Sequence, residues 1–418
     1  MINNLREPKR IFEDNLTTRQ RTGKVWQVIF LLATIIAIIS LTLLMINIID
    51  SVFGYVIIDS EIDPASLAID GVPIEEQTSE QLTEIMRANL SKGAFNKLNT
   101  EKPFTERKRS EIYALVEERI LKEDILESWS LGDSLLKKEK ILKEYAVIQV
   151  EHPRARLKFI SWLTKDRLTR PQSSEVMTAG IRTAILGSLW TILITIIFAF
   201  PIGVGAAIYL EEYAGQHWIN RVIQTNINNL AGVPSIIYGI LGLAIFVRSL
   251  ESLTSGAIFG YVDPITANGR TILSAGLTLG LLVLPLIIIN SQEAIRSVPQ
   301  SLRNAGYGLG ATKWQIIWAH VLPNAMPGIL TGTILAISRA IGETAPLVVV
   351  GASTAISFDP SSVFSKFTTL PIQIYQWTAR PQPEWRHLAG ATILVLLVLL
   401  LGLNAVAIVM RNKLSRKY

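Results

Sequence analysis

Residues 25–49 read VWQVIFLLATIIAIISLTLLMINII, an apolar run without a charged side chain. A helix of about 20 residues spans the roughly 30 Å hydrocarbon core of a bilayer, and the run is too long for the apolar part of a signal peptide. It therefore predicts a retained transmembrane helix. Five further apolar segments complete the prediction of an all-α integral membrane protein with six transmembrane helices: residues 183–210, 229–247, 271–290, 325–350 and 388–410.

The composition excludes an ordinary cytosolic protein. Only 18% of the 418 residues are charged, against about 25% in soluble domains, and the mean hydropathy is +0.36. Residues 50–177 carry a net charge of −4 and the rest of the chain +10. The basic excess therefore accompanies the apolar segments, which indicates membrane topology and no nucleic-acid partner. With no cysteine and four scattered histidines, we expect neither a metal site nor a cofactor.

Charge in the short flanking segments predicts the orientation, because Lys and Arg prefer the cytoplasmic side. Residues 1–24 contain six basic residues, and four more follow residue 410. Both termini are therefore predicted to be cytoplasmic. The segment 291–323 is then cytoplasmic as well, whereas residues 50–177 form an extracytoplasmic insert between helix 1 and a five-helix core, residues 178–418.

The insert is long enough to fold as a small domain. Four of its apolar residues recur near helical spacing: Ile112, Leu115, Val116 and Ile120. We predict a mainly helical domain with a short strand near residues 145–150. No nucleophile elbow or paired-carboxylate signature occurs in it, so its sequence does not indicate a function.

The segment 291–323, called the elbow below, reads SQEAIRSVPQSLRNAGYGLGATKWQIIWAHVLP. Gly310 is suited to the positive φ that ends a helix, and Thr312 with Gln315 has the spacing of a capping box that opens another. Two apolar stripes at helical spacing are predicted, Leu302, Ala305, Gly306 and Leu309 in the first helix and Trp314, Ile317, Trp318 and Val321 in the second. Two short helices with a sharp turn would suit docking into a partner's groove, although an amphipathic connector on the membrane surface would show the same pattern.

This elbow resembles the EAA loop of ABC-importer permeases, whose pattern is Glu-Ala-Ala, a later Gly and a closing hydrophobic-Pro pair. The matching positions are Asn304, Ala305, Gly306, Gly310, Leu322 and Pro323. Asn304 replaces the family's Glu, which puts in question any salt link from that position to an ATPase. Four other segments resemble the permeases of phosphate importers: residues 179–189 (AGIRTAILGSL), 207–214 (AIYLEEYA), 232–239 (GVPSIIYG) and 338–346 (SRAIGETAP).

The resemblance covers about residues 179–418 and implies half of a phosphate pathway in the bacterial inner membrane. It also implies a related second permease (PstC-like), a dimer of ATP-binding subunits (PstB-like), an extracytoplasmic phosphate-binding protein (PstS-like) and surrounding lipid. The positions implied to couple to the ATPase are Arg303, Asn304, Ala305, Gly306, Gly310, Thr312, Leu322 and Pro323. The long insert resembles extended variants of the family.

Arg339 and Glu343 are ionisable residues inside the predicted span 325–350, where charge is costly and usually faces a bundle interior or a water-filled path. Their i, i+4 spacing permits an ion pair. Such a pair either locks helix packing or places Arg339 in the substrate pathway, where its planar fork matches two phosphate oxygens. Arg182, at the outer end of the second span, either guides an anion inward or extends to the membrane interface.

Three other functions remain open from the sequence. An ABC-importer permease for molybdate, sulfate or another solute would have the same pattern, whereas a secondary transporter would use Arg339 and Glu343 as an ion relay and is expected to show internal repeats. A membrane-anchored sensor would use the insert. The chain itself is not expected to be an enzyme, because Gly23-Lys24 lacks the upstream Gly and the following Ser or Thr of an ATP-binding loop.

Overall fold

The computed structural model describes residues 16–69, 71–215, 217–261, 268–352, 356 and 359–414. The chain divides into two compact units, Met1–Ile49 and Asp50–Tyr418. The first unit holds most of α1 (Leu16–Val52), a continuous helix whose most apolar window has no buried residue. Its apolar residues are spread around the whole circumference, which is typical of a membrane span.

The insert contains a three-stranded antiparallel sheet with β1 (Phe53–Asp59) between β2 (Asp124–Ser128) and β3 (Arg156–Ser161). Val56 lies opposite Ser128 on one side and Lys158 on the other. The strand predicted near residues 145–150 is wrong, because these residues continue α6 (Lys138–Glu151). The Lys and Glu residues that precede them in α6 favour a helix, and Lys140 and Glu144 form an i, i+4 ion pair.

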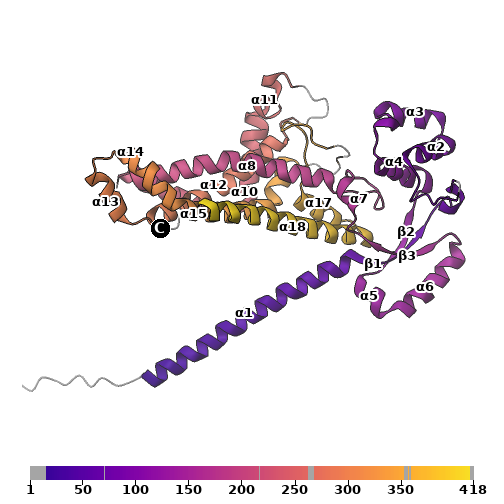
Figure 1. Cartoon of the computed structure of the whole chain (residues 1–418), viewed down its shortest axis with the longest axis horizontal. Helices are drawn as coiled ribbons and strands as arrows, with labels where there is room; N and C mark the ends of the chain where they lie inside the picture. Colours follow the sequence, from indigo (N-terminus) through magenta and orange to yellow (C-terminus); the bar gives the residue numbers. More distant parts are fainter. Residues whose placement is uncertain are drawn as a thin grey trace, which may run out of the picture. The chain divides into compact units, whose positions relative to one another are not determined.

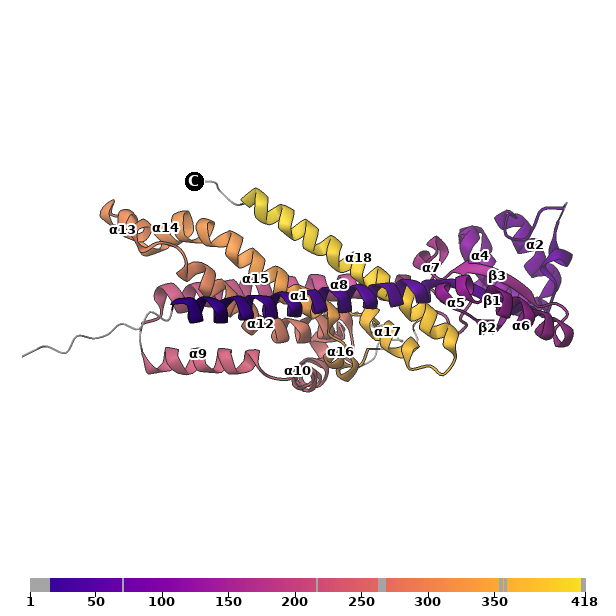
Figure 2. The same ribbon diagram turned by 90° about the horizontal axis from the view of Figure 1, so that it is seen from below.

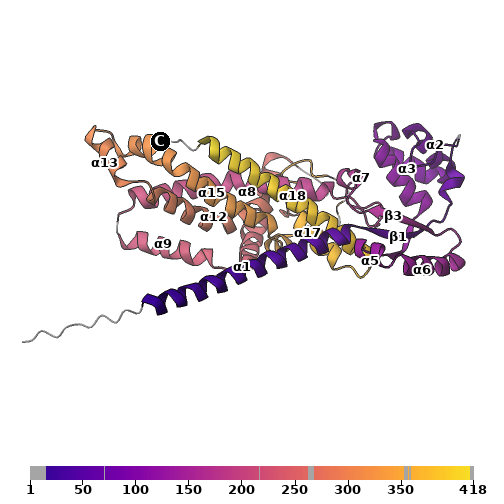
Figure 3. The ribbon, with the colours of Figure 1, turned by 60° about the horizontal axis from the view of Figure 1, so that its bottom comes forward.

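Three helices of the insert lie together beside the sheet and build an apolar core of their own (Figure 3). They are α2 (Ser79–Asn89), α3 (Lys92–Glu101) and α4 (Arg109–Val116), which continues as a π-helical turn, Glu117–Leu121. The predicted helical spacing is confirmed, because Ile112, Val116 and Ile120 are all buried in this core. Two short helices complete the insert, α5 (Leu131–Leu136) and α7 (Lys165–Thr169).

Two buried arginines, Arg167 and Arg170, join the insert to the start of the core. Arg170 forms an ion pair with Glu117 at 2.8 Å, with both side chains almost inaccessible. Burial raises the pKa of Glu117, and the neighbouring Arg170 opposes that rise. Arg167 donates to the carbonyl oxygens of Val176 and Ala179, and burial lowers its pKa to about 10. These contacts fix the chain where it enters the next helix.

Aromatic residues make the second connection between the insert and the core. Trp162 stacks on His387 with ring centroids 5.4 Å apart, and His387 Nδ1 lies 2.6 Å from the backbone oxygen of Ser51. Trp377 and Trp385 pack in the same cluster. They belong to α17 (Leu370–Thr378) and α18 (Pro383–Leu414). The insert therefore contacts the end of the core where α18 begins.

Three long apolar helices pack side by side at the centre of the core, and a fourth, α18, packs against α15 (Leu322–Gly342) (Figure 1). The three are α8 (Arg182–Ile208), α12 (Ile272–Arg296) and α15; α12 contacts both α8 and α15. Glycines permit this closeness, since a Cβ at Gly276 would lie 2.5 Å from Ile194 and one at Gly332 would lie 2.3 Å from Asn290. In the described residues, five helices are long and apolar enough to span a membrane.

A sixth span exists only as a bent pair. The helices α9 (Trp218–Ala231) and α10 (Ser235–Gly242) meet at an angle of 107°, and α10 continues as a π-helical turn, Leu243–Ser249. The span predicted over residues 229–247 is therefore divided: residues 229–231 end α9, and residues 235–247 lie in α10 and its π-helical continuation. Pro234 precedes α10 and cannot donate a helical hydrogen bond, which explains the break. Figure 2 shows α9 running along α12 and then the turn into α10.

Candidate functional site: the elbow and the polar network behind it

The elbow folds as two short helices with the predicted turn between them. Gly310 follows α13 (Gln300–Gly308) with φ +78°, and α14 (Lys313–Ile316) begins immediately afterwards. Thr312 and Gln315 form the capping box, in which the Gln315 side chain accepts from the Thr312 backbone N–H at 2.8 Å. A π-helical turn, Ile317–Val321, then leads into α15. The predicted secondary structure of the elbow is confirmed.

The elbow has two arms: the first is α13, and the second is α14 with the π-helical turn that follows it. Gly306 allows the two arms to pack closely. It is buried in α13, and an added Cβ would lie 2.7 Å from the Ile316 side chain. Its backbone oxygen accepts from Ala311 N at 3.1 Å. A glycine in place of the family's second Ala thus permits a closer contact between the helices than a methyl group would.

The predicted apolar stripes are only partly correct. Gly306, Ile317 and Val321 are buried, but Leu309 is 90% exposed. Two tryptophans assigned to the second stripe, Trp314 and Trp318, are also more than half exposed and stack on each other at 5.6 Å. Periodicity places them on one helix, but the buried face turned out to be that of Ile316, Ile317 and Val321. The elbow therefore presents large apolar side chains outward, which is typical of a protein-binding surface.

The other predicted coupling residues divide between this outward surface and the base of the elbow. Asn304 and Ala305 are exposed on α13, and the Asn304 side chain accepts from Gln300 at 3.5 Å. Leu322 packs against the core cluster, and Pro323 lies in the first turn of α15, where its missing N–H is tolerated.

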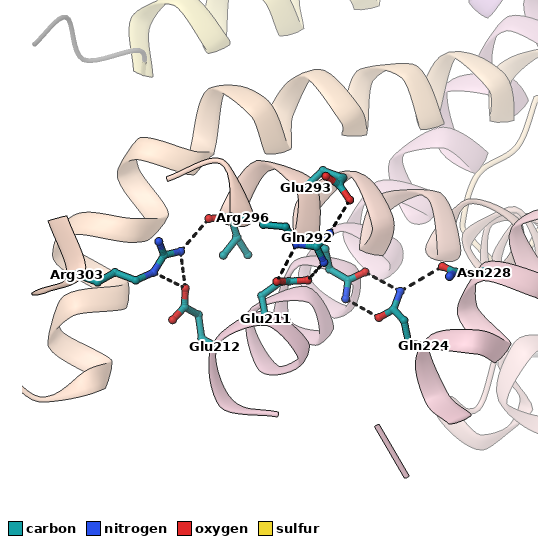
Figure 4. A network of polar contacts seen from close by, with 9 residues as sticks. Glu211, Glu212, Gln224, Asn228, Gln292, Glu293, Arg296 and Arg303 are labelled. Carbon is teal, nitrogen blue, oxygen red and sulfur yellow. Dashed lines mark hydrogen bonds and ion pairs between the residues drawn. The ribbon is translucent and has the colours of Figure 1, made fainter. Parts of the chain in front are cut away.

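Arg303 faces inward and fixes the elbow to the core. Its guanidinium forms an ion pair with Glu212 at 2.9 Å and donates to the backbone oxygens of Val298 and Ile295 (Figure 4). Beside it, Arg296 pairs with Glu211 at 2.6 Å. Both glutamates lie in the π-helical turn Tyr209–Tyr213 that continues α8. The pair Glu211-Glu212 belongs to the segment 207–214, but nothing in its spacing indicated this role.

A reciprocal amide pair links α9 to α12. Gln224 donates to Gln292 at 3.1 Å and accepts from it at 2.7 Å, and Gln224 also donates to Asn228. These residues line one wall of a cleft of about 670 Å³ at the same end of the core. The cleft is lined in part by Glu211, Asn220, Arg221, Gln224, Asn228 and Gln292. The polar network of Figure 4 thus ties α8, α9, α12 and α13 together.

Arg339 and Glu343 form the predicted pair, with 3.4 Å between Arg339 Nε and a Glu343 carboxylate oxygen. Arg339 is 45% exposed and Glu343 19%. The span predicted over residues 325–350 is present but ends earlier, because α15 ends at Gly342 and Glu343 has an extended backbone before α16 (Ala345–Val350). The break places Glu343 at the end of a helix, with α16 packed against α10.

Arg182 begins α8 but is paired with different residues. Its guanidinium donates to the backbone oxygen of Thr169 and forms an ion pair with Asp359 at 2.8 Å, while Thr183 donates to Asp359 at 3.1 Å. In the described part of the chain, no ion pair joins Arg182 to Arg339 or Glu343. The residues that the structure describes also include no group of His, Cys, Asp or Glu side chains that could hold a metal ion.

Comparison with known proteins places this geometry in a family. Residues 199–418 match the model of the "binding-protein-dependent transport system inner membrane component". The phosphate transport system permease protein PstA of Yersinia pestis is 33% identical over 228 residues, covering 54% of this chain and 71% of the relative. The PstA of Mycobacterium leprae is 36% identical over 232 residues, covering 55% and 70%.

A probable ABC transporter permease of Bacillus subtilis, YqgI, is 30% identical over 260 residues, which cover 59% of this chain and 83% of the relative. The family match covers the elbow and the core from the second half of α8 onward. The chain therefore belongs to the binding-protein-dependent transport system inner membrane components and, within them, to the PstA-type permeases.

Proposed function

We propose that this chain is one half of the transmembrane pathway of an ATP-driven importer of inorganic phosphate. The observation that carries the proposal is the similarity to proteins named phosphate transport system permease protein PstA, at 33% and 36% identity over about 70% of their length. The chain itself acts as a permease and not as an enzyme, and ATP hydrolysis belongs to a partner subunit.

The partners are a PstC-like second permease, a dimer of PstB-like ATPase subunits and a PstS-like phosphate-binding protein. The outward surface of the elbow supports an ATPase as the docking partner. Leu309, Trp314 and Trp318 supply the large exposed apolar and aromatic side chains that dominate protein interfaces. Asn304 and Ala305 are exposed on the adjoining helix.

Coupling requires that movement of the elbow reaches the spans. The Arg303–Glu212 ion pair connects the first arm to the end of α8, and the second arm continues through Val321 directly into α15. Closure of the ATPase dimer would therefore move α8 and α15 together. Small shifts at such packed contacts are converted into discrete rearrangements, because cores do not deform continuously.

Arg339 is the candidate substrate contact of the pathway. Its guanidinium is accessible at the α15–α16 break, and its planar fork suits two oxygens of a phosphate. Glu343 positions that fork from the helix end. Arg182 is a second candidate, at the outer end of α8, where Asp359 carboxylate oxygens contact both Arg182 and Thr183.

The chain lies in the bacterial inner membrane with both termini in the cytoplasm. With the bent α9–α10 pair counted as one span, the described residues hold six spans, an even number. The domain organisation is a cytoplasmic segment 1–24, helix 1 at 25–49, an extracytoplasmic insert at 50–177 and the permease core at 178–418. The elbow lies at one end of the core and α17 at the other (Figure 1), consistent with opposite sides of the membrane.

Uptake by the reconstituted four-component complex tests the proposal. Phosphate should accumulate only with ATP and with the binding protein, and excess sulfate or molybdate should not compete. Competition by either anion would indicate a different substrate. Phosphate uptake by this chain alone on an ion gradient would instead indicate a secondary transporter.

A further inference from the structure

The junction of α5 and α6 exposes two leucines beside a cluster of lysines. Leu135 is 70% exposed and Leu136 87%, and both lie at the end of α5. The residues that follow include four lysines, Lys137, Lys138, Lys140 and Lys143. Adjacent large apolar side chains with surrounding basic residues are typical of a segment that lies in a membrane interface.

Two contacts place this junction at the membrane boundary. Asp50 directly follows the apolar run 25–49, and its carboxylate accepts a hydrogen bond from the backbone N–H of Gly132 at the start of α5. The next residue, Ser51, contacts His387, which lies at the beginning of the apolar stretch of α18. Residues 50–51 therefore adjoin the ends of two membrane spans.

The distance from Gly132 to the leucines is short. At a rise of 1.5 Å per residue, Leu135 and Leu136 lie only about 5–6 Å along α5 from the hydrogen-bonded Gly132. Ser134 holds this helix against the sheet, because its hydroxyl oxygen accepts from Tyr55 N at 2.9 Å. The exposed leucines thus lie within about one helical turn of the residue bonded to Asp50, and large apolar side chains are stabilised in a membrane interface.

The lysines supply charge complementary to lipid phosphates. Lys137 pairs with Asp133 at 2.7 Å and Lys140 with Glu144 at 3.4 Å. Lys138 and Lys143 have no carboxylate partner among the residues that the structure describes. Two ammonium groups are therefore available to headgroups beside the two leucines.

We propose that the α5–α6 junction binds the bilayer surface on the side of the insert, with Leu135 and Leu136 in the acyl boundary and Lys138 and Lys143 on lipid phosphates. This contact adds a further attachment of the insert, besides the covalent link to α1, the contacts of Arg167 and Arg170, and the aromatic cluster at α18. It does not depend on the transported substrate.

The absence of cysteine in the chain makes a direct test simple. Full-length Leu136→Cys, labelled with a fluorophore, is reconstituted into phosphatidylcholine vesicles with and without phosphatidylglycerol. A spin-labelled lipid should quench this probe several-fold more than a probe at Lys97→Cys, an exposed position of α3. Iodide in the water should show the reverse order.

A second pair of variants tests the lysines. Lys138→Gln with Lys143→Gln should reduce the lipid quenching of the Leu136→Cys probe in vesicles that contain phosphatidylglycerol. Lys137→Gln with Lys140→Gln, which removes only lysines already paired with carboxylates, should reduce it less. Equal iodide quenching at positions 136 and 97 would overturn the proposal. Protection of position 136 only in the assembled complex would also overturn it, because a protein partner would then cover the leucines.

Discussion

Arg303 and Glu212 are 91 residues apart in the chain, yet their side chains meet at 2.9 Å with no more than 11% of either exposed. The guanidinium also holds two backbone oxygens at the end of α12. This single arginine therefore fixes the first arm of the elbow to two core helices at once.

Arg303→Ala should uncouple the transporter. It leaves Glu212 buried without its partner, and breaking a buried pair typically costs about 3–5 kcal/mol. We expect a lower unfolding temperature of the purified complex and loss of ATPase stimulation by the loaded binding protein. Arg296→Ala is the matched control, since Arg296 is 61% exposed and such pairs contribute about 0–1 kcal/mol. Equal effects of both substitutions would contradict this interpretation.

Gly310→Ala should weaken the elbow because of its backbone conformation. No atom lies within 4 Å of a Cβ at this position, so bulk is not the reason. A residue with a Cβ at φ +78° costs about 1–2 kcal/mol. Gly308→Ala, also in open space but inside α13, should be neutral or stabilising. Thermal unfolding and stimulated ATPase activity check both, and normal coupling in Gly310→Ala would make the elbow a passive connector.

Trp314→Ala with Trp318→Ala should weaken binding of the ATPase subunit without destabilising the permease. Both rings are exposed, so their loss leaves no cavity in this chain. Removing an aromatic interface anchor typically costs at least about 2 kcal/mol. Recovery of the ATPase by co-purification measures the effect. Trp218→Ala, another exposed tryptophan, is the control, and unchanged recovery in the double variant would place the docking surface elsewhere.

Arg339→Lys should assemble but transport poorly, since lysine keeps the charge and loses the planar fork. The double variant Arg339→Met with Glu343→Leu distinguishes a pathway role from a packing role. Replacing an ion pair with apolar residues is often neutral for stability, so a structural pair would leave uptake intact. Complex recovery is measured before phosphate uptake. Near-normal uptake in the double variant would remove both residues from the pathway.

The insert should be reached from outside the cell membrane. A membrane-impermeant thiol reagent should label Asn99→Cys, at an exposed site on α3, in intact spheroplasts. A cysteine added at the C-terminus should be labelled only after lysis. The opposite pattern would invert the topology.

Predictions from local chemistry agreed with the structure. The apolar runs became long helices, Gly310 has the positive φ expected at a helix end, and Thr312 with Gln315 forms the capping box. Each depends on residues a few positions apart. The family pattern in the elbow was visible for the same reason, because its positions lie within one short segment.

Predictions that depended on the buried face or on helix continuity were wrong. Leu309 and the two elbow tryptophans fit an apolar period but are exposed, since periodicity does not say which face meets the core. Hydropathy located both apolar segments, but the bounds that it gave run across the helix breaks at Pro234 and Glu343. Residues 145–150 looked like a strand, yet their helix-favouring neighbours and the Lys140–Glu144 pair keep them in α6.

The amino acids alone therefore specified a multi-span membrane protein with a hinged elbow, because transfer into lipid and turn geometry are local properties of the chain. Only the tertiary structure decided which core residues hold the elbow in place. Glu211 and Glu212 meet Arg296 and Arg303 only because packed glycines bring α8 and α12 close together, and Gln224 reaches Gln292 only because α9 packs along α12. Contacts between distant segments depend on helix packing, and no local pattern encodes them.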